Sequence, residues 1–264
     1  DGPISGSAVT LHIVNADGST GEQVAGPFTT DSSGEWSGTI PSDITRKLVV
    51  VALGGQYIDD ATGATITLAA DEKLHSWFDA SSPENSGVVS PITDSLWQVA
   101  RNQMSQGDSA TEAVDSIEQL ASDFWSLNPT DVTPDESSEN TSQQRYGVLL
   151  AAFSFLMDNN TKLQSAPFAS MERFTLMRLI MNDMADGRLD GLDLNDLPVL
   201  AADGTPLPAL SHHDLSAFFH EANARAESLS INVIEEDPLK KLSPYSYTLS
   251  CPENGFYLYG PYVD

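Results

Sequence analysis

The chain has 264 residues and a formal net charge of -26, from 38 Asp and Glu against 12 Lys and Arg, yet 40% of its residues are hydrophobic. That hydrophobic share excludes a disordered acidic tail and predicts a folded core beneath an acidic surface. Such a surface repels nucleic acid and anionic membrane, and it attracts divalent cations and cationic partners. We therefore expect a protein of a salty, calcium-containing exterior, with no nucleic-acid partner.

Two further exclusions come from the composition. The chain has one cysteine, Cys251, so it forms no disulfide within itself. No apolar run reaches the roughly 18 residues that a membrane-spanning helix needs, so we expect no such segment. The length allows two domains of ordinary size. Neither end resembles a natural terminus, and we expect a piece of a longer chain whose oligomeric state is open.

Residues 1–75 predict a small antiparallel β-sandwich. Val9, Leu11 and Ile13 alternate with polar residues, the period of a half-buried strand. Residues 48–53 form a continuous apolar run, which indicates a central strand covered on both faces. Turns separate these segments, and residues 64–68 are expected to be the last short strand. A linker over residues 76–89 would follow the sandwich.

From Ser90 the apolar residues recur at helical spacing, and residues 90–235 predict an all-α bundle. Ser90 and Pro91 fit the first two positions of a helix, and Ser109 with Glu112 forms a capping box. The five expected helices cover residues 90–104, 109–124, 143–157, 169–184 and 214–229. Residues 236–264 form a strand-like aromatic tail. The predicted fold class is therefore α+β, with a small antiparallel β-sandwich followed by a helical bundle.

The amino-terminal part also resembles a known family. Gly2 to Gly6 lead into Val9, and the pattern continues through residues 29–41, 54–59, 61–63 and 89–93. This order resembles the carboxypeptidase-regulatory-like, or transthyretin-like, β-sandwich of Ig-like surface proteins and lipoproteins of marine and soil proteobacteria. The resemblance implies a helical segment after the sandwich, an extracellular or cell-envelope location, and no enzymatic activity.

The strongest candidate for a binding site is the acidic, glycine-containing segment of residues 182–196. Calcium takes six to eight oxygen ligands, which a flexible acidic loop after a helix can supply. Calcium is therefore the expected ion. The candidate metal-binding residues are Asn182, Asp186, Arg188, Asp190 and Asp193.

Aligned on an EF-hand loop, Asn182 takes position one, Asp186 position five, Asp190 position nine and Asp193 position twelve. The alignment departs from the pattern at position three, which is Met184, and at position twelve, where Asp replaces the usual Glu. The alternative is a helix end followed by two glycine turns whose acids are solvated.

Other candidate sites have weaker patterns. Asp59 and Asp60 could meet Asp17 and Asp31 at one end of a sandwich and bind calcium, although solvated turn carboxylates are the simpler interpretation. His213 and His220 could share a helix face and bind zinc, but the second histidine of a His-Glu-x-x-His motif is missing. No nucleophile elbow, phosphate loop or dinucleotide fingerprint is present.

These observations favour a non-enzymatic structural or adhesive module of a secreted or cell-surface bacterial protein, stabilised by calcium. One alternative is a module that binds a surface glycan or a peptide of a protein ligand, through the helical domain or the aromatic tail. A second alternative is an extracellular hydrolase, because the many carboxylates leave acid–base chemistry open.

Overall fold

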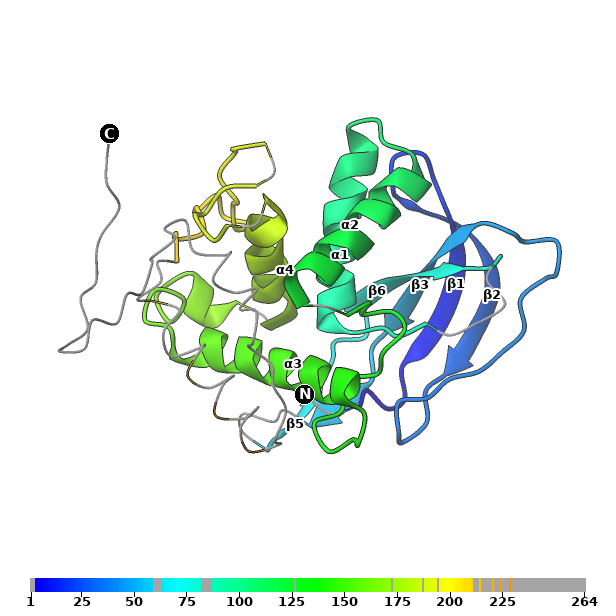
Figure 1. Cartoon of the computed structure of the whole chain (residues 1–264), viewed down its shortest axis with the longest axis horizontal. Helices are drawn as coiled ribbons and strands as arrows, with labels where there is room; N and C mark the ends of the chain where they lie inside the picture. The colour runs from blue at the N-terminus through cyan, green and yellow to red at the C-terminus, as the bar shows by residue number, and fades with distance from the viewer. Residues whose placement is uncertain are drawn as a thin grey trace, which may run out of the picture.

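The computed structural model describes residues 3–58, 63–81, 87–125, 127–171, 173–186, 188–193 and 195–210, and the single residues 214, 220, 224 and 228. Within these residues the chain forms an antiparallel sheet followed by four α-helices, which confirms the predicted α+β class. Figure 1 shows the sheet on one side of the molecule and the helices on the other, with α1 and α4 side by side.

The main sheet has four antiparallel strands in the order β2-β1-β3-β6. Their bounds are β1 (Ala8–Val14), β2 (Thr20–Thr29), β3 (Lys47–Leu53) and β6 (Lys73–Asp79). The short strands β4 (Gln56–Ile58) and β5 (Thr65–Thr67) pair with each other in a separate sheet. The described strands thus form an open sheet and a hairpin, and they do not show the predicted sandwich.

Strand β3 is the central strand that its apolar run predicts. Its five middle residues are all buried, and they alternate between two apolar clusters. Leu48 and Val50 pack on one face with Val9 and Leu11 of β1. Val49 and Val51 pack on the other face against the helices. Because both faces are covered, no polar residue interrupts the run.

The prediction that residues 64–68 are the last strand is wrong. Strand β6 follows them, occupies the first residues of the expected linker and pairs with β3, so that Trp77 lies opposite Val49. Leu74 and Phe78 face one side of the sheet, while His75 and Trp77 face the helices. A histidine on the covered face breaks the apolar alternation that would have marked a strand.

The described helices are α1 (Pro91–Ser105), α2 (Ala110–Trp125), α3 (Thr141–Asn159) and α4 (Arg173–Asp183), with 3-10 turns η1 (Phe168–Ser170) and η2 (Met184–Asp186). They confirm four of the five predicted helices. The fifth, over residues 214–229, lies largely outside the described residues, and the aromatic tail of residues 236–264 lies entirely outside them. None of the helices in the described part is long and apolar enough to cross a membrane.

Both predicted helix starts are confirmed. The Ser90 side chain accepts a hydrogen bond from the backbone N–H of Thr93, and Pro91 is the first helical residue of α1. Ser90 Oγ also lies 2.5 Å from the Tyr146 hydroxyl of α3, and burial raises the pKa of that phenol. At α2, the Ser109 hydroxyl donates to a Glu112 carboxylate oxygen at 2.7 Å.

The sheet and the helices share one apolar core. Val49, Val51 and Trp77 belong to the same buried cluster as residues from all four helices. Trp97 of α1 is fully buried in this cluster. Packing therefore continues across the boundary that the sequence places between the β and the α parts.

Several turns are closed by an Asp whose carboxylate accepts the backbone N–H two residues on, in Asp-x-Ser or Asp-x-Thr segments. The aspartates are Asp17, Asp31, Asp79, Asp135 and Asp203. At Asp31 the Ser33 hydroxyl also donates to the carboxylate, at 2.7 Å. The hydroxyl of Ser33, then the backbone N–H groups of Glu35 and Ser33, hold the pKa of Asp31 below its ordinary value.

We expect Ser33→Ala to make the stability of the protein less dependent on pH. Because the pKa of Asp31 is lower in the folded chain than in the unfolded one, its hydrogen bonds contribute stability above the unfolded pKa of about 4 and lose it as the pH falls further. The difference in Tm between pH 7 and pH 3 should therefore be smaller in the variant. The control is Ser32→Ala, at the exposed neighbouring position, which should show the same difference in Tm between pH 7 and pH 3 as the wild type. If both variants showed the same Tm difference, this explanation would be wrong.

Candidate functional site

The residues predicted to bind calcium follow one another along the end of α4 and the turns after it. Asn182 lies in the last turn of α4, Asp186 ends η2, and Arg188 is exposed. In the part of the chain that the structure describes, no group of three His, Cys, Asp or Glu residues could hold a metal ion. The side chain of Asp186 lies outside that part. Calcium binding at this loop therefore stays a prediction.

Asp190 and Asp193 each close a turn of their own. Asp190 Oδ1 accepts the backbone N–H of Leu192 at 3.1 Å. Asp193 Oδ1 accepts the N–H groups two and four residues further on, at 2.9 and 3.1 Å. The buried Asp183 accepts the N–H of Gly191 at 2.8 Å and so ties the loop back to α4. These hydrogen bonds match the alternative of glycine turns after a helix.

The structure describes the other predicted groups only in part. Asp17 and Asp31 each bond within their own turns. Asp59, Asp60, His213 and Cys251 lie outside the described residues, while His220 is described and exposed. The second calcium group and the zinc pair therefore also stay predictions.

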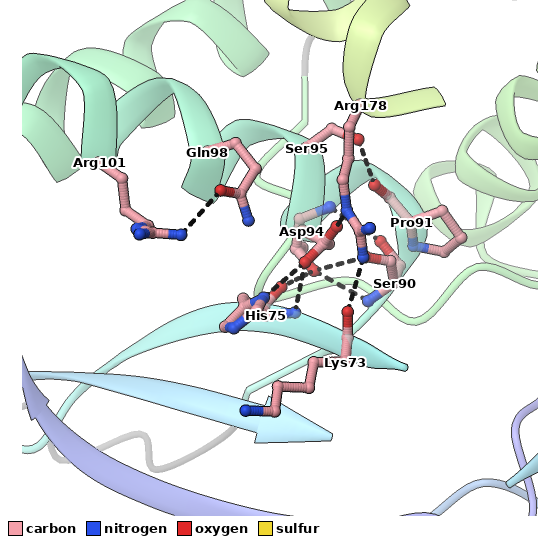
Figure 2. Close-up of polar contacts among 10 residues, drawn as sticks. Lys73, His75, Ser90, Pro91, Asp94, Ser95, Gln98, Arg101 and Arg178 are labelled. Atoms are coloured by element: carbon pink, nitrogen blue, oxygen red, sulfur yellow. Dashed lines mark hydrogen bonds and ion pairs between the residues drawn. The ribbon is translucent and has the colours of Figure 1, made fainter. Parts of the chain in front are cut away.

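The sequence analysis missed a buried polar cluster around Asp94 of α1. The Asp94 side chain is 1% exposed and lies between β6 and α4 (Figure 2). Its Oδ1 accepts the backbone N–H of His75 at 2.9 Å and lies 2.7 Å from His75 Nδ1. Its Oδ2 pairs with Arg178 Nε, and Arg178 Nη2 donates to the carbonyl of Lys73 at 2.6 Å. One carboxylate thus joins a strand and two helices.

The Asp94 cluster borders a cleft of about 470 Å³ that is lined in part by His75, Gln98, Thr175 and Arg178. A carboxylate bonded to a histidine orients the imidazole, as in proton-transfer sites. Here the same carboxylate also pairs with the Arg178 guanidinium, and it accepts the backbone N–H of His75 on β6. We therefore interpret the cluster as a clamp that fixes α1 and α4 on the sheet.

A larger cavity, of about 1010 Å³, lies on the sheet face away from Trp77 and the main core. Its floor is formed by one residue from each of three strands, namely Val9, Ala52 and Phe78. Its roof is the long connection between β2 and β3, which contributes Trp36, Ile40 and Ile44. We call this the sheet cavity.

Aromatic contacts fix the walls of the sheet cavity. Phe28 stacks on Trp36 with ring centroids 5.8 Å apart, and Tyr57 stacks on Phe174 of α4 at 5.6 Å. All four rings line the cavity. Gly38 lets the roof pass close over Phe28, because a Cβ at this position would lie 2.0 Å from the ring. The cavity therefore has defined aromatic walls.

The charged side chains that line the sheet cavity in the described part of the chain are all negative. Its lining includes two carboxylate side chains, Glu35 and Asp131, both from exposed residues. Among the described residues, no Lys, Arg or His lines it. Small-molecule sites are typically concave, mostly apolar and about 300–1000 Å³ in volume, with a few polar groups that orient the ligand. The sheet cavity is concave and close to this size, and ten Ser and Thr residues line it beside its apolar and aromatic side chains.

We compared the chain with models of protein families, with curated proteins and with solved structures, and none of the three comparisons gave a match.

Proposed function

We propose that the chain is a non-enzymatic structural or adhesive module of a secreted or cell-surface bacterial protein, and that the sheet cavity is its binding element. The observation that carries the binding role is the apolar cavity of about 1010 Å³ between the sheet and the connection from β2 to β3. The acidic surface supports an exterior location, since it keeps a protein soluble and apart from anionic membranes. The proposed class of module is taken from the resemblance in the sequence, whose sandwich the described strands do not show.

The floor of the sheet cavity favours a ligand with an apolar body. The side chains of Ala52 and Phe78 present carbon atoms at its floor, and transfer of apolar surface from water to such a floor is favourable. We therefore propose a small molecule with an apolar body as the ligand.

The binding role can be tested with N-phenyl-1-naphthylamine, an uncharged dye that fluoresces in apolar surroundings. We expect saturable, one-to-one binding to the wild-type chain. Ala52→Leu fills the floor of the cavity and should weaken binding at least tenfold, because the added side chain occupies the ligand volume. Trp36→Ala removes a wall that is only partly buried, and it should also weaken binding.

The matched control is Ala202→Leu, which makes the same change at an exposed position outside the cavity lining. It should bind the dye as the wild type does. Circular dichroism of each variant separates lost binding from lost folding. Dye binding that is absent from the wild type, or that folded Ala52→Leu and Trp36→Ala chains retain in full, would reject the proposed binding role.

A further inference from the structure

The residues that line the sheet cavity indicate the charge of its ligand as well as the ligand's apolar body. We propose that it binds a cationic amphiphile, an organic ammonium group attached to an apolar chain or ring. This inference rests on the proposed binding role and names the chemical class of the ligand. Three features of the cavity support this ligand class: its lining carries negative charge and no described positive charge, its walls are aromatic, and its apolar floor is buried while its carboxylates are exposed.

The first feature is charge complementarity. Glu35 and Asp131 are exposed residues of the cavity lining, and no described Lys, Arg or His lies beside them there. Neither carboxylate has a partner of opposite charge among the ion pairs of the described residues. Either carboxylate would repel an anionic head group bound beside it and attract an ammonium group.

The second feature is the aromatic lining. Phe28, Trp36, Tyr57, Phe78 and Phe174 all line the cavity. The faces of aromatic rings attract cations, and quaternary ammonium groups are recognised by aromatic walls of this kind. Trp36 and Glu35 are neighbours in the chain, and both line the cavity.

The third feature is the direction that the ligand would take. The floor of Val9, Ala52 and Phe78 is apolar and buried, whereas Glu35 and Asp131 are exposed. An amphiphile can place its apolar body on the sheet and its charged end at the carboxylates without burying the charge. A ligand with a charge at both ends could not do so, because burial of an unpaired ion is strongly unfavourable.

The experiment compares decyltrimethylammonium, decanol and decanoate, which share a ten-carbon chain and differ in the charge of the head group. Each is titrated as a competitor of N-phenyl-1-naphthylamine in 0.15 M salt, the two ions below their micelle concentrations and decanol below its solubility limit. At this ionic strength the Debye length is about 8 Å, so charges far from the cavity contribute little. We expect decyltrimethylammonium to bind at least tenfold more tightly than decanoate, with decanol between them.

The double variant E35Q/D131N should lose most of the preference for the cation, so that its affinities for decyltrimethylammonium and decanoate become nearly equal. The control E22Q/D108N removes the same charge at two exposed positions outside the cavity lining and should keep the preference. Equal binding of cation and anion by the wild type, or a preference that survives in E35Q/D131N, would overturn the inference while leaving the binding role intact. Absence of dye binding would overturn both.

Discussion

Replacement of Asp94 by Asn should lower the free energy of unfolding by about 3–5 kcal/mol, the usual cost of removing one partner of a buried ion pair. The Asp94 side chain is 1% exposed, and it pairs with Arg178 of α4 while it accepts hydrogen bonds from His75 of β6. The variant leaves the Arg178 guanidinium partly buried without its carboxylate. Urea denaturation followed by circular dichroism measures the loss.

The Asp158→Asn variant is the matched control for this prediction. Asp158 pairs with Arg173 at 2.9 and 3.0 Å, but the two side chains are 35% and 22% exposed. Because solvent screens such a pair, we expect a loss of about 1 kcal/mol or less. If the two variants lost the same stability, the Asp94 cluster would be an ordinary surface pair and not a clamp between the sheet and the helices.

Trp77→Ala should destabilise the chain by about 3–5 kcal/mol, because it leaves a large void in a well-packed core. Trp77 is 2% exposed, and its Nε1 donates to Glu118 of α2 at 2.7 Å. The residue belongs to the core that the sheet shares with the helices. The sheet and the helices should therefore both lose stability. Amide hydrogen exchange should become faster in peptides from β3 and in peptides from α1.

The comparison for Trp77 is Trp36→Ala, which removes the same ring from a partly buried position in the roof of the sheet cavity. It should cost clearly less stability and leave hydrogen exchange in α1 unchanged. Faster exchange confined to β3 in Trp77→Ala, with α1 still protected, would mean that the β and α parts fold independently, as two domains.

Local features of the fold could be predicted from the sequence because they depend on neighbouring residues. The starts of α1 and α2 require only Ser90, Pro91, Ser109 and Glu112, which act within one turn of a helix. The apolar run of β3 likewise specifies a strand covered on both faces. In each case the residues that decide the structure are adjacent in the chain.

The features that the sequence did not predict join distant residues. Asp94 contacts His75 across 19 positions and Arg178 across 84, and no spacing pattern links the three. Strand β6 was missed because His75 lies on its covered face, where this polar partner replaces an apolar side chain. The one available signal was the pair of adjacent aromatic residues Trp77 and Phe78. Their side chains lie on opposite faces of the sheet, as in a strand that is buried on both sides.

The candidate sites also differ in whether their residues are close together in the chain or far apart. Acidic residues near glycine in residues 182–196 were visible in the sequence, but Asp190 and Asp193 use their carboxylates to close separate turns. The sheet cavity draws its lining from residues between Pro3 and Phe174, so no local pattern could have marked it. Trp36 and Ile40 in a glycine-rich connection were its only visible sign, as apolar side chains in a segment with no strand or helix period.

The central claim is that the sheet cavity binds an apolar ligand, and isothermal titration calorimetry with decyltrimethylammonium tests it most directly. We predict one binding site per chain and a negative change in heat capacity, the mark of apolar surface leaving water. Both should be lost in Ala52→Leu and kept in Ala202→Leu. Several weak sites, or a single site that Ala52→Leu leaves unchanged, would contradict the claim, since binding would then reflect the acidic surface and not the cavity.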